Sequence, residues 1–288
     1  MAPANGASRA TFDRMACKLA VGTMPAVAVT IAALALLAPA DDRGDRRARA
    51  TIPVAATASR APVPILVYHA IRTPPAGARL PSIYVRPAEL AAQVRALRRA
   101  GYSAVTLQRL WDAWHGRATL PRRPVVLSFD DGYASQVRIA LPVLRRERWP
   151  GVLNLALDWV DDLGGDRAVQ QLIDAGWQID GHSRTHPDLT RVTAAQLADE
   201  TAGARDELRE RFGVDASFFA YPGGRYDARV AAAVEDAGYL GATTVKRRFA
   251  TPAAPYELAR IQVGRGTSGD ALLRRLRDLR SRSTAATR

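Results

Sequence analysis

From about residue 63 onward, short apolar runs alternate with longer segments in which apolar residues recur at helical spacing. Continuous apolar runs are typical of strands buried on both faces, and such strands occur mainly in parallel sheets that helices cover. Parallel neighbours need long crossover connections, which the helical segments can provide. The alternation therefore predicts an α/β fold.

The predicted strands span 65–68, 103–106, 125–129, 152–157, 178–181, 218–221, 241–245 and 261–263. The predicted helices span 87–99, 107–114, 133–146, 167–175, 194–212, 227–237 and 270–280. This succession fits a distorted or incomplete (β/α) barrel with mostly parallel strands. An open, doubly wound sheet is the alternative.

The N-terminal region has a different composition. Basic residues precede an apolar stretch over 19–40, and the Ala-Pro-Ala sequence at 38–40 resembles a signal-peptide cleavage site. The stretch is also long enough to cross a membrane. We interpret residues 1–40 as a signal peptide or a membrane anchor, with a buried core helix as a third interpretation.

Residues 41–62 are polar, rich in alanine and without periodicity, which is typical of a disordered linker. The folded domain is therefore expected over 63–288. Both main interpretations of the leader place this domain outside the cytoplasm, secreted or anchored to the cell membrane.

The chain carries 41 basic and 28 acidic residues, a net charge of +13. Such a charge would suit nucleic acid, an anionic membrane surface or an anionic cell-wall polymer. The arginines are, however, spread over the predicted helices rather than gathered in one block, which is typical of arginine-rich codon usage. We expect no nucleic-acid partner, membrane contact only through the N-terminal segment, and a monomer. The apolar face of the helix at 270–280 is expected to close the barrel, with a membrane-surface role as the alternative.

Cys17 is the only cysteine, which excludes an intrachain disulfide and a zinc site built on several thiolates. Any metal must be held by His, Asp or Glu. Catalytic residues of a (β/α) barrel lie at the carboxyl ends of its strands.

Asp130 and Asp131 follow the predicted strand at 125–129, in the sequence Ser-Phe-Asp-Asp-Gly. Neighbouring side chains of a strand point in opposite directions, so one carboxylate can bind a metal while the other handles a proton. An Asp-Asp-Gly turn with a helix cap is the structural alternative.

His182 and His186 follow the predicted strand at 178–181, in the sequence His-Ser-Arg-Thr-His-Pro. Two imidazoles four residues apart can converge on one cation, and His with carboxylate suits zinc or a similar divalent ion. The sequence therefore predicts a metal site. Zinc is the first choice, with cobalt and nickel as alternatives.

Together the two motifs resemble those of the polysaccharide deacetylase family (NodB-like, carbohydrate esterase family four). The resemblance covers roughly residues 63–263. It implies a distorted (β/α) barrel and metal-dependent removal of acetyl groups from sugars. It further implies that Asp131, His182 and His186 are metal ligands and that Asp130 is the general base.

Residues 219–224, Phe-Ala-Tyr-Pro-Gly-Gly, are similar to the family's third motif, Arg-Pro-Pro-Tyr-Gly. Ala220 occupies the arginine position, so the arginine that would orient the base is absent there. The backbone N–H of Gly223 could still stabilise the oxyanion, and Tyr221 is expected to bind substrate. A Pro-Gly-Gly turn with no further role is the alternative.

The family's last motif supplies a histidine as general acid, but no histidine follows His186. His69, after the first predicted strand, is the remaining histidine at a strand end. This arrangement resembles the subgroup that acts on poly-N-acetylglucosamine. His69 is expected to protonate the leaving amine or bind substrate, with a packed structural histidine as the alternative. Arg260 is expected to orient a carboxylate or bind substrate.

Three aromatic residues could stack on sugar rings: Tyr84, Trp159 and Tyr226. The resemblance implies an extracytoplasmic, metal-dependent hydrolase that removes N-acetyl groups from N-acetylglucosamine units of an extracellular or cell-wall glycan. An O-acetyl carbohydrate esterase and an inactive carbohydrate-binding module of the same fold are the alternatives.

Overall fold

The structure is a computed structural model that describes residues 60–285. The predicted leader at 1–40 and most of the predicted linker lie outside the described residues. Within residues 60–285, no helix is long and apolar enough to cross a membrane.

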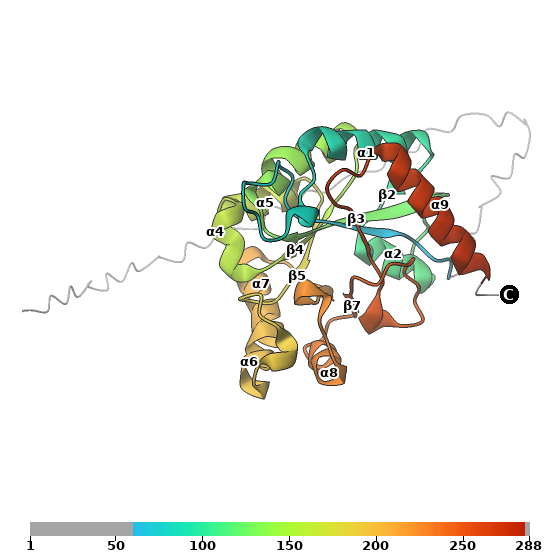
Figure 1. The fold of residues 1–288 in the computed structure, drawn as a ribbon. Helices are drawn as coiled ribbons and strands as arrows, with labels where there is room; N and C mark the ends of the chain where they lie inside the picture. Colours follow the sequence, from blue (N-terminus) through green and yellow to red (C-terminus); the bar gives the residue numbers. More distant parts are fainter. Residues whose placement is uncertain (1–59, 286–288) are drawn as a thin grey trace, which may run out of the picture. The chain divides into compact units, whose positions relative to one another are not determined.

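Strands and helices alternate along the described part of the chain (Figure 1). The strands are β1 (Ile65–Tyr68), β2 (Ser103–Ala104), β3 (Pro124–Asp131), β4 (Val152–Leu155), β5 (Gln178–Gly181), β6 (Phe218–Ala220), β7 (Gly241–Thr243) and β8 (Ile261–Gln262). The α-helices are α1 (Pro87–Arg99), α2 (Leu107–Trp114), α3 (Leu141–Arg146), α4 (Val160–Leu163), α5 (Asp166–Asp174), α6 (Ala194–Ala198), α7 (Ala204–Phe212), α8 (Ala228–Asp236) and α9 (Gly269–Ala285).

All strand pairings within the sheet are parallel, in the order β7-β6-β5-β4-β3-β1-β8, with β2 beside β3. The segment before β8 joins the two ends of this order. Leu258 exchanges backbone hydrogen bonds with the β7 side, at Ala242 and Thr244, while β8 pairs with β1. The strands therefore form a distorted (β/α) barrel, as predicted, and an open doubly wound sheet is excluded.

Helices cover the outside of the barrel. Leu272 and Leu276 of α9 are fully buried in the main apolar core, and α9 packs against α1 (Figure 1). The predicted apolar face of this helix therefore contributes to closing the barrel. Local signals start the helices where expected: Pro87 begins α1, and the Thr193 hydroxyl and the Gln196 side chain form a capping box at α6.

Two helices predicted as continuous are interrupted by π-helical turns. The predicted helix at 133–146 contains a π-helical turn at Gln136–Ala140 before α3. The predicted helix at 194–212 contains one at Asp199–Gly203, between α6 and α7. Such turns occur frequently at functional sites. Gln136 of the first turn donates to the carbonyl oxygen of Asp130 at 2.6 Å, and Glu200 of the second accepts from the Arg184 N–H at 2.8 Å.

Candidate metal centre

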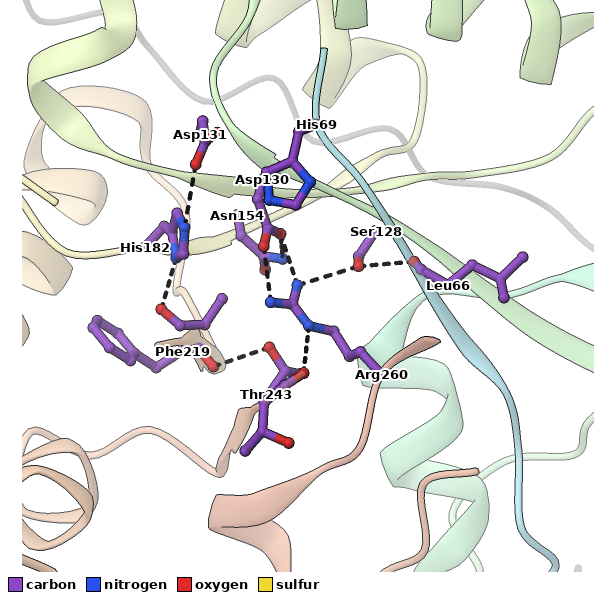
Figure 2. Close-up of polar contacts among 12 residues, drawn as sticks. Leu66, His69, Ser128, Asp130, Asp131, Asn154, His182, Phe219, Thr243 and Arg260 are labelled. Atoms are coloured by element: carbon purple, nitrogen blue, oxygen red, sulfur yellow. Dashed lines mark hydrogen bonds and ion pairs between the residues drawn. The ribbon is translucent and has the colours of Figure 1, made fainter. Parts of the chain in front are cut away.

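The ends of β3 and β5 bring together three side chains that could hold a metal ion, those of Asp131, His182 and His186 (Figure 2 shows Asp131 and His182). One potential ligand atom from each of Asp131, His182 and His186 lies within 4.8 Å of the others. The Nε2 atoms of His182 and His186 lie 3.4 and 3.5 Å from Oδ1 of Asp131. One carboxylate oxygen and two imidazole nitrogens form a donor set that suits zinc and similar divalent ions.

The backbone at this cluster adopts conformations that favour glycine. Asp131, Ser183 and His186 have φ angles of 84°, 66° and 60°. Residues other than glycine rarely adopt positive φ, and they persist there only where surrounding contacts hold them. One such contact is the hydrogen bond that the His186 N–H donates to Ser183 Oγ, at 3.0 Å.

The orientation of His182 leaves one ring nitrogen for a metal. Its Nδ1 lies 2.7 Å from the carbonyl oxygen of Ala220, which can only accept, so Nδ1 carries a proton. In the neutral ring, Nε2 then carries the lone pair and is available to a metal, whereas in the protonated ring Nε2 can donate a hydrogen bond to Asp131. Hydrogen bonds of this kind commonly orient metal-binding histidines.

The pKa shifts of Asp131, His182 and His186 are those expected for a carboxylate that lies between two imidazoles. Burial would raise the pKa of Asp131, but the hydrogen bond from His182 and nearby charges outweigh it and lower that pKa. Burial would lower the pKa of His182, but its hydrogen bond with Asp131 raises it. Burial and the neighbouring His182 lower the pKa of His186. Asp131 is thus ionised at neutral pH.

Asp130 is buried beside the cluster in a bidentate ion pair with Arg260 (Figure 2). Nη1 and Nη2 of Arg260 donate to Oδ1 and Oδ2 of Asp130 at 2.7 and 2.8 Å, and Asn154 Nδ2 donates to Oδ1 at 2.7 Å. Burial would raise the pKa of Asp130, but the charge of Arg260 and the neighbouring histidines lower it well below its usual range.

Arg260 is itself held at two further points of the barrel. Its Nε donates to the carbonyl oxygen of Thr244 at 3.0 Å, and its Nη1 lies 3.4 Å from Ser128 Oγ, which donates to the Leu66 carbonyl. It therefore lies where an arginine can orient Asp130, although it precedes β8 and does not belong to the third motif. Its side chain is 1% exposed and paired with Asp130, and substrate binding by Arg260 stays a prediction.

His69 follows β1 and its ring lies next to Asp130 (Figure 2). It is partly exposed, and its Nδ1 is buried without a hydrogen-bond partner among the described residues. The histidine predicted from the first strand end is thus near the cluster, and its ring has an unused polar atom.

The third motif forms the loop after β6. Gly223 has a φ of 60° and is exposed, and no described contact joins it to the metal cluster. Tyr221 is fully buried: its hydroxyl donates to the Tyr256 carbonyl at 3.1 Å, and its ring stacks on Tyr226 with centroids 4.5 Å apart. The structure thus buries the side chain of Tyr221 beneath Tyr226, and substrate binding by Tyr221 stays a prediction.

Aromatic rings border the cluster on the side of the loop after β4. The Trp159 ring stacks on His186 with centroids 5.0 Å apart, and Tyr133 lies 6.4 Å from Trp159. Both rings line a cavity of about 290 Å³ that Arg72 and Asp162 also line. Of the three aromatic residues predicted to stack on sugars, Trp159 is the one in contact with the metal cluster.

Two supporting residues are not predicted from the sequence. Asn154 lies inside a predicted apolar strand, where a polar residue indicates a buried hydrogen bond. Glu200 accepts hydrogen bonds from the backbone N–H groups of Arg184 and Thr185 at 2.8 and 2.9 Å, and from the Thr185 hydroxyl at 2.6 Å. It thereby holds the loop between the two histidines.

Relatives in sequence agree with this description. The Bacillus subtilis protein YxkH is 26% identical over 218 residues, which cover 75% of this chain and 76% of YxkH. The poly-beta-1,6-N-acetyl-D-glucosamine N-deacetylase of Escherichia coli is 36% identical over 100 residues, which cover 33% of this chain and 15% of that enzyme.

A solved structure has the same fold. The Streptococcus pyogenes deacetylase PplD superposes with a TM-score of 0.69 at 22% identity, covering 75% of this chain and 98% of PplD. Residues 117–242 match the family described as polysaccharide deacetylase. This segment contains the Asp-Asp and His-x-x-x-His motifs that carried the resemblance, so this segment of the chain belongs to the polysaccharide deacetylase family.

Proposed function

We propose that the protein is a metal-dependent N-deacetylase that hydrolyses the acetamide of N-acetylglucosamine units in an extracellular or cell-wall polysaccharide. The observation that carries the proposal is the convergence of Asp131, His182 and His186 beside a second carboxylate, Asp130, that Arg260 orients. Family membership supports the reaction class.

Asp131, His182 and His186 would hold a divalent ion, because their ligand atoms converge and Asp131 is ionised. An ion bound there would polarise the acetyl carbonyl and lower the pKa of a water molecule. We propose zinc, with cobalt and nickel as alternatives that the same ligands accept.

Asp130 would take the proton of the attacking water. Its Oδ1 accepts two of the hydrogen bonds described above and its Oδ2 accepts one, so Oδ2 retains a lone pair. The low pKa of Asp130 makes it a weak base. It can therefore accept the proton effectively only from a water molecule whose pKa is strongly lowered. Its action as a base would thus depend on the ion held by Asp131, His182 and His186.

The remaining steps need a proton donor for the leaving amine and a hydrogen-bond donor for the oxyanion. As the water oxygen bonds to the acetyl carbon and the carbon–nitrogen bond breaks, His69 would protonate the leaving nitrogen. The products are acetate and a free amine. The N–H of Gly223 would stabilise the oxyanion, since backbone donors can serve without a side chain. Tyr221 would support the substrate side of this loop.

The substrate we propose is an N-acetylglucosamine-containing glycan outside the cytoplasm, with the segment 1–40 as leader or anchor. Support comes from the similarity of 100 residues to the Escherichia coli N-deacetylase, whose name specifies such a polymer. We propose that the chain acts as a monomer and meets the membrane only through its N-terminal segment.

The test is acetate release from N-acetylglucosamine oligomers and from O-acetylated xylan oligomers, with the metal-loaded protein. We expect release from the N-acetylated oligomers and a decrease of about 10²-fold or more in Asp130→Asn, which cannot accept the proton. Release only from the O-acetylated oligomers would identify an esterase. Tight glycan binding without release from either would identify a binding module.

His69→Ala tests the proposed proton donor. We expect kcat on the acetamide substrate to fall about 10²-fold, because the leaving amine loses its proton source. An aryl acetate, whose leaving group needs no proton, should be hydrolysed at nearly the parent rate. His115→Ala is the matched control, because His115 packs on Trp111 with its Nδ1 2.8 Å from the Trp111 carbonyl. If kcat of His69→Ala fell equally on the acetamide and on the aryl acetate, His69 would not be the proton donor.

A further inference from the structure

His69 and Asp130 lie side by side at the ends of neighbouring strands. β1 and β3 pair in parallel up to Tyr68 and Phe129, and His69 and Asp130 are the next residue of each chain segment. Figure 2 shows the His69 ring next to the Asp130 carboxylate. Proton transfer depends on the distance and angle between the groups that take part, so the relative position of these two side chains matters for the proposed reaction.

The two side chains are held in different ways. The carboxylate of Asp130 accepts three hydrogen bonds from Arg260 and Asn154 (Figure 2). The ring of His69, in contrast, has a buried Nδ1 without a hydrogen-bond partner within residues 60–285. The position of the His69 ring therefore depends mainly on the backbone that carries it.

The side chain of Gln136 joins the backbones of these two residues. It is fully buried, and its Nε2 donates to the carbonyl oxygens of Asp130 at 2.6 Å and of His69 at 3.3 Å. A primary amide has two N–H donors and a carbonyl oxygen can only accept, so these contacts identify which end of the amide is the nitrogen. The Oε1 of Gln136 is buried and has no hydrogen-bond partner among the described residues. Gln136 thus links two site residues at the cost of an unsatisfied polar atom.

The residue before Gln136 holds the same segment. The N–H of Ile71 donates to Ser135 Oγ at 2.9 Å, so residues 135 and 136 contact the backbone at both residue 71 and residue 69. Gln136 begins the π-helical turn Gln136–Ala140, in which the Leu141 N–H donates to the carbonyl oxygen of Gln136, five residues earlier. The connection after β3 therefore holds the connection after β1 at the point where His69 leaves the sheet.

We propose that Gln136 is a positioning residue for His69. Its amide fixes the distance between the imidazole that protonates the leaving amine and the carboxylate that accepts the proton of the attacking water. The inference rests on the proposed function, in which His69 and Asp130 have these roles. Asp130 keeps its three side-chain hydrogen bonds when the amide is removed, so the loss affects His69. Because Gln136 is fully buried, it acts through His69 and does not contact the substrate.

The test compares Gln136→Met with a matched control, Gln93→Met. Both substitutions keep the length of the side chain and remove its amide. Gln93 is also fully buried, its Nε2 donates to the Thr267 carbonyl at 2.7 Å, and its Oε1 likewise has no partner in the described part of the chain. It lies between α1 and the segment before α9, so it controls for the general effect of losing a buried amide. Urea unfolding verifies that each variant is folded.

We expect kcat of Gln136→Met on the acetamide substrate to fall about tenfold, because the proton donor is displaced. The kcat on an aryl acetate, whose leaving group needs no proton, should stay within about twofold. In a His69→Ala background, Gln136→Met should cause no further loss on the acetamide, since both changes act through the same group. Gln93→Met should leave the ratio of the two rates unchanged. Equal losses of Gln136→Met on both substrates, or full additivity with His69→Ala, would overturn the inference.

The position of His69 is also measured without catalysis. The imidazole NMR signals of His69, assigned by comparison with His69→Ala, should shift in Gln136→Met and stay unchanged in Gln93→Met. Ser135→Ala, at a partly exposed position, should shift the same signals less and replaces Gln136→Met if that variant does not fold. Unchanged His69 signals would overturn the inference whether or not the protein is active. Absence of acetate release by the metal-loaded parent would refute the proposed function, while the His69 signals would still decide whether Gln136 positions the ring.

Discussion

The ion pair between Asp130 and Arg260 is the most informative single contact of the site. Both side chains are almost completely buried, and two parallel hydrogen bonds fix the plane of the carboxylate. Burying charges is unfavourable unless they are paired and hydrogen-bonded, so removal of either partner leaves an uncompensated charge. The pair therefore sets both the orientation and the ionisation of Asp130.

Arg260→Gln should separate these effects. We expect kcat to fall about 10²-fold, because Asp130 loses its orientation. The acid limb of the kcat/KM profile should move to higher pH, since burial then raises the pKa of Asp130 without an opposing arginine. Arg260→Lys keeps the charge but not the paired hydrogen bonds. Its kcat and the position of its acid limb should therefore lie between those of the parent and those of Arg260→Gln. Arg191→Gln, at an exposed ion pair with Asp188, is the control, and a merely structural Arg260 would leave the shape of the pH profile unchanged.

At the scale of elements, the π-helical turn at Asp199–Gly203 holds the loop that carries His182 and His186, without itself containing a candidate metal ligand. It contains the buried Glu200, whose carboxylate accepts hydrogen bonds from the loop that joins His182 to His186. A hydrogen-bonded support of this kind fixes ligands before the metal binds.

Glu200→Ala should weaken metal binding about 10- to 100-fold, although Glu200 is not a ligand, because the loop between the histidines loses its acceptor. Metal titration by calorimetry measures the change. Glu210→Ala, at an exposed position of α7, is the matched control. Unchanged affinity in Glu200→Ala would show that the histidines hold their positions without this helix.

Asp180 connects β5 to the start of β6. Its Oδ1 accepts from the N–H groups of Ser217 and Phe218 at 3.2 and 3.1 Å, and its Oδ2 accepts from Gln178 Nε2 at 2.7 Å. Burial nevertheless raises the pKa of Asp180 to about 7. The folded protein therefore holds a proton here that the unfolded chain releases near its ordinary, lower pKa.

The raised pKa of Asp180 predicts how Asp180→Asn changes the pH dependence of the free energy of unfolding. The stabilisation from the raised pKa is fully present at low pH and is lost as the pH rises through about 7. The asparagine does not titrate and keeps an acceptor for the two N–H groups. Between pH 5 and pH 8, the free energy of unfolding of the parent should therefore fall relative to the variant by about 2 kcal/mol. Urea unfolding at the two pH values measures this, and parallel profiles would show that Asp180 is ionised throughout.

For the whole molecule, local patterns predicted the fold well and long-range pairing poorly. Strands β1 and β5 have the predicted bounds, and β1 was predictable because burial on both faces of a strand leaves a continuous apolar run in the sequence. The π-helical turns were missed, since one extra residue per turn hardly disturbs helical periodicity.

Some residues of the candidate site were likewise predicted from local patterns, whereas others depend on long-range contacts. Asp131, His182 and His186 could be grouped because short motifs at strand ends carry them. The pairing of Asp130 with Arg260 joins residues 130 positions apart and has no local pattern. It depends on the closure of the barrel between β7, β8 and β1, which only the three-dimensional arrangement shows.

The central claim is that Asp131, His182 and His186 hold one catalytic divalent ion, and metal titration coupled to acetate release tests it most directly. We predict one ion bound per chain, loss of acetate release after chelation, recovery on adding zinc, cobalt or nickel, and loss of binding in His186→Ala. Full acetate release by the chelated protein, or stoichiometric binding that His186→Ala leaves unchanged, would contradict the account.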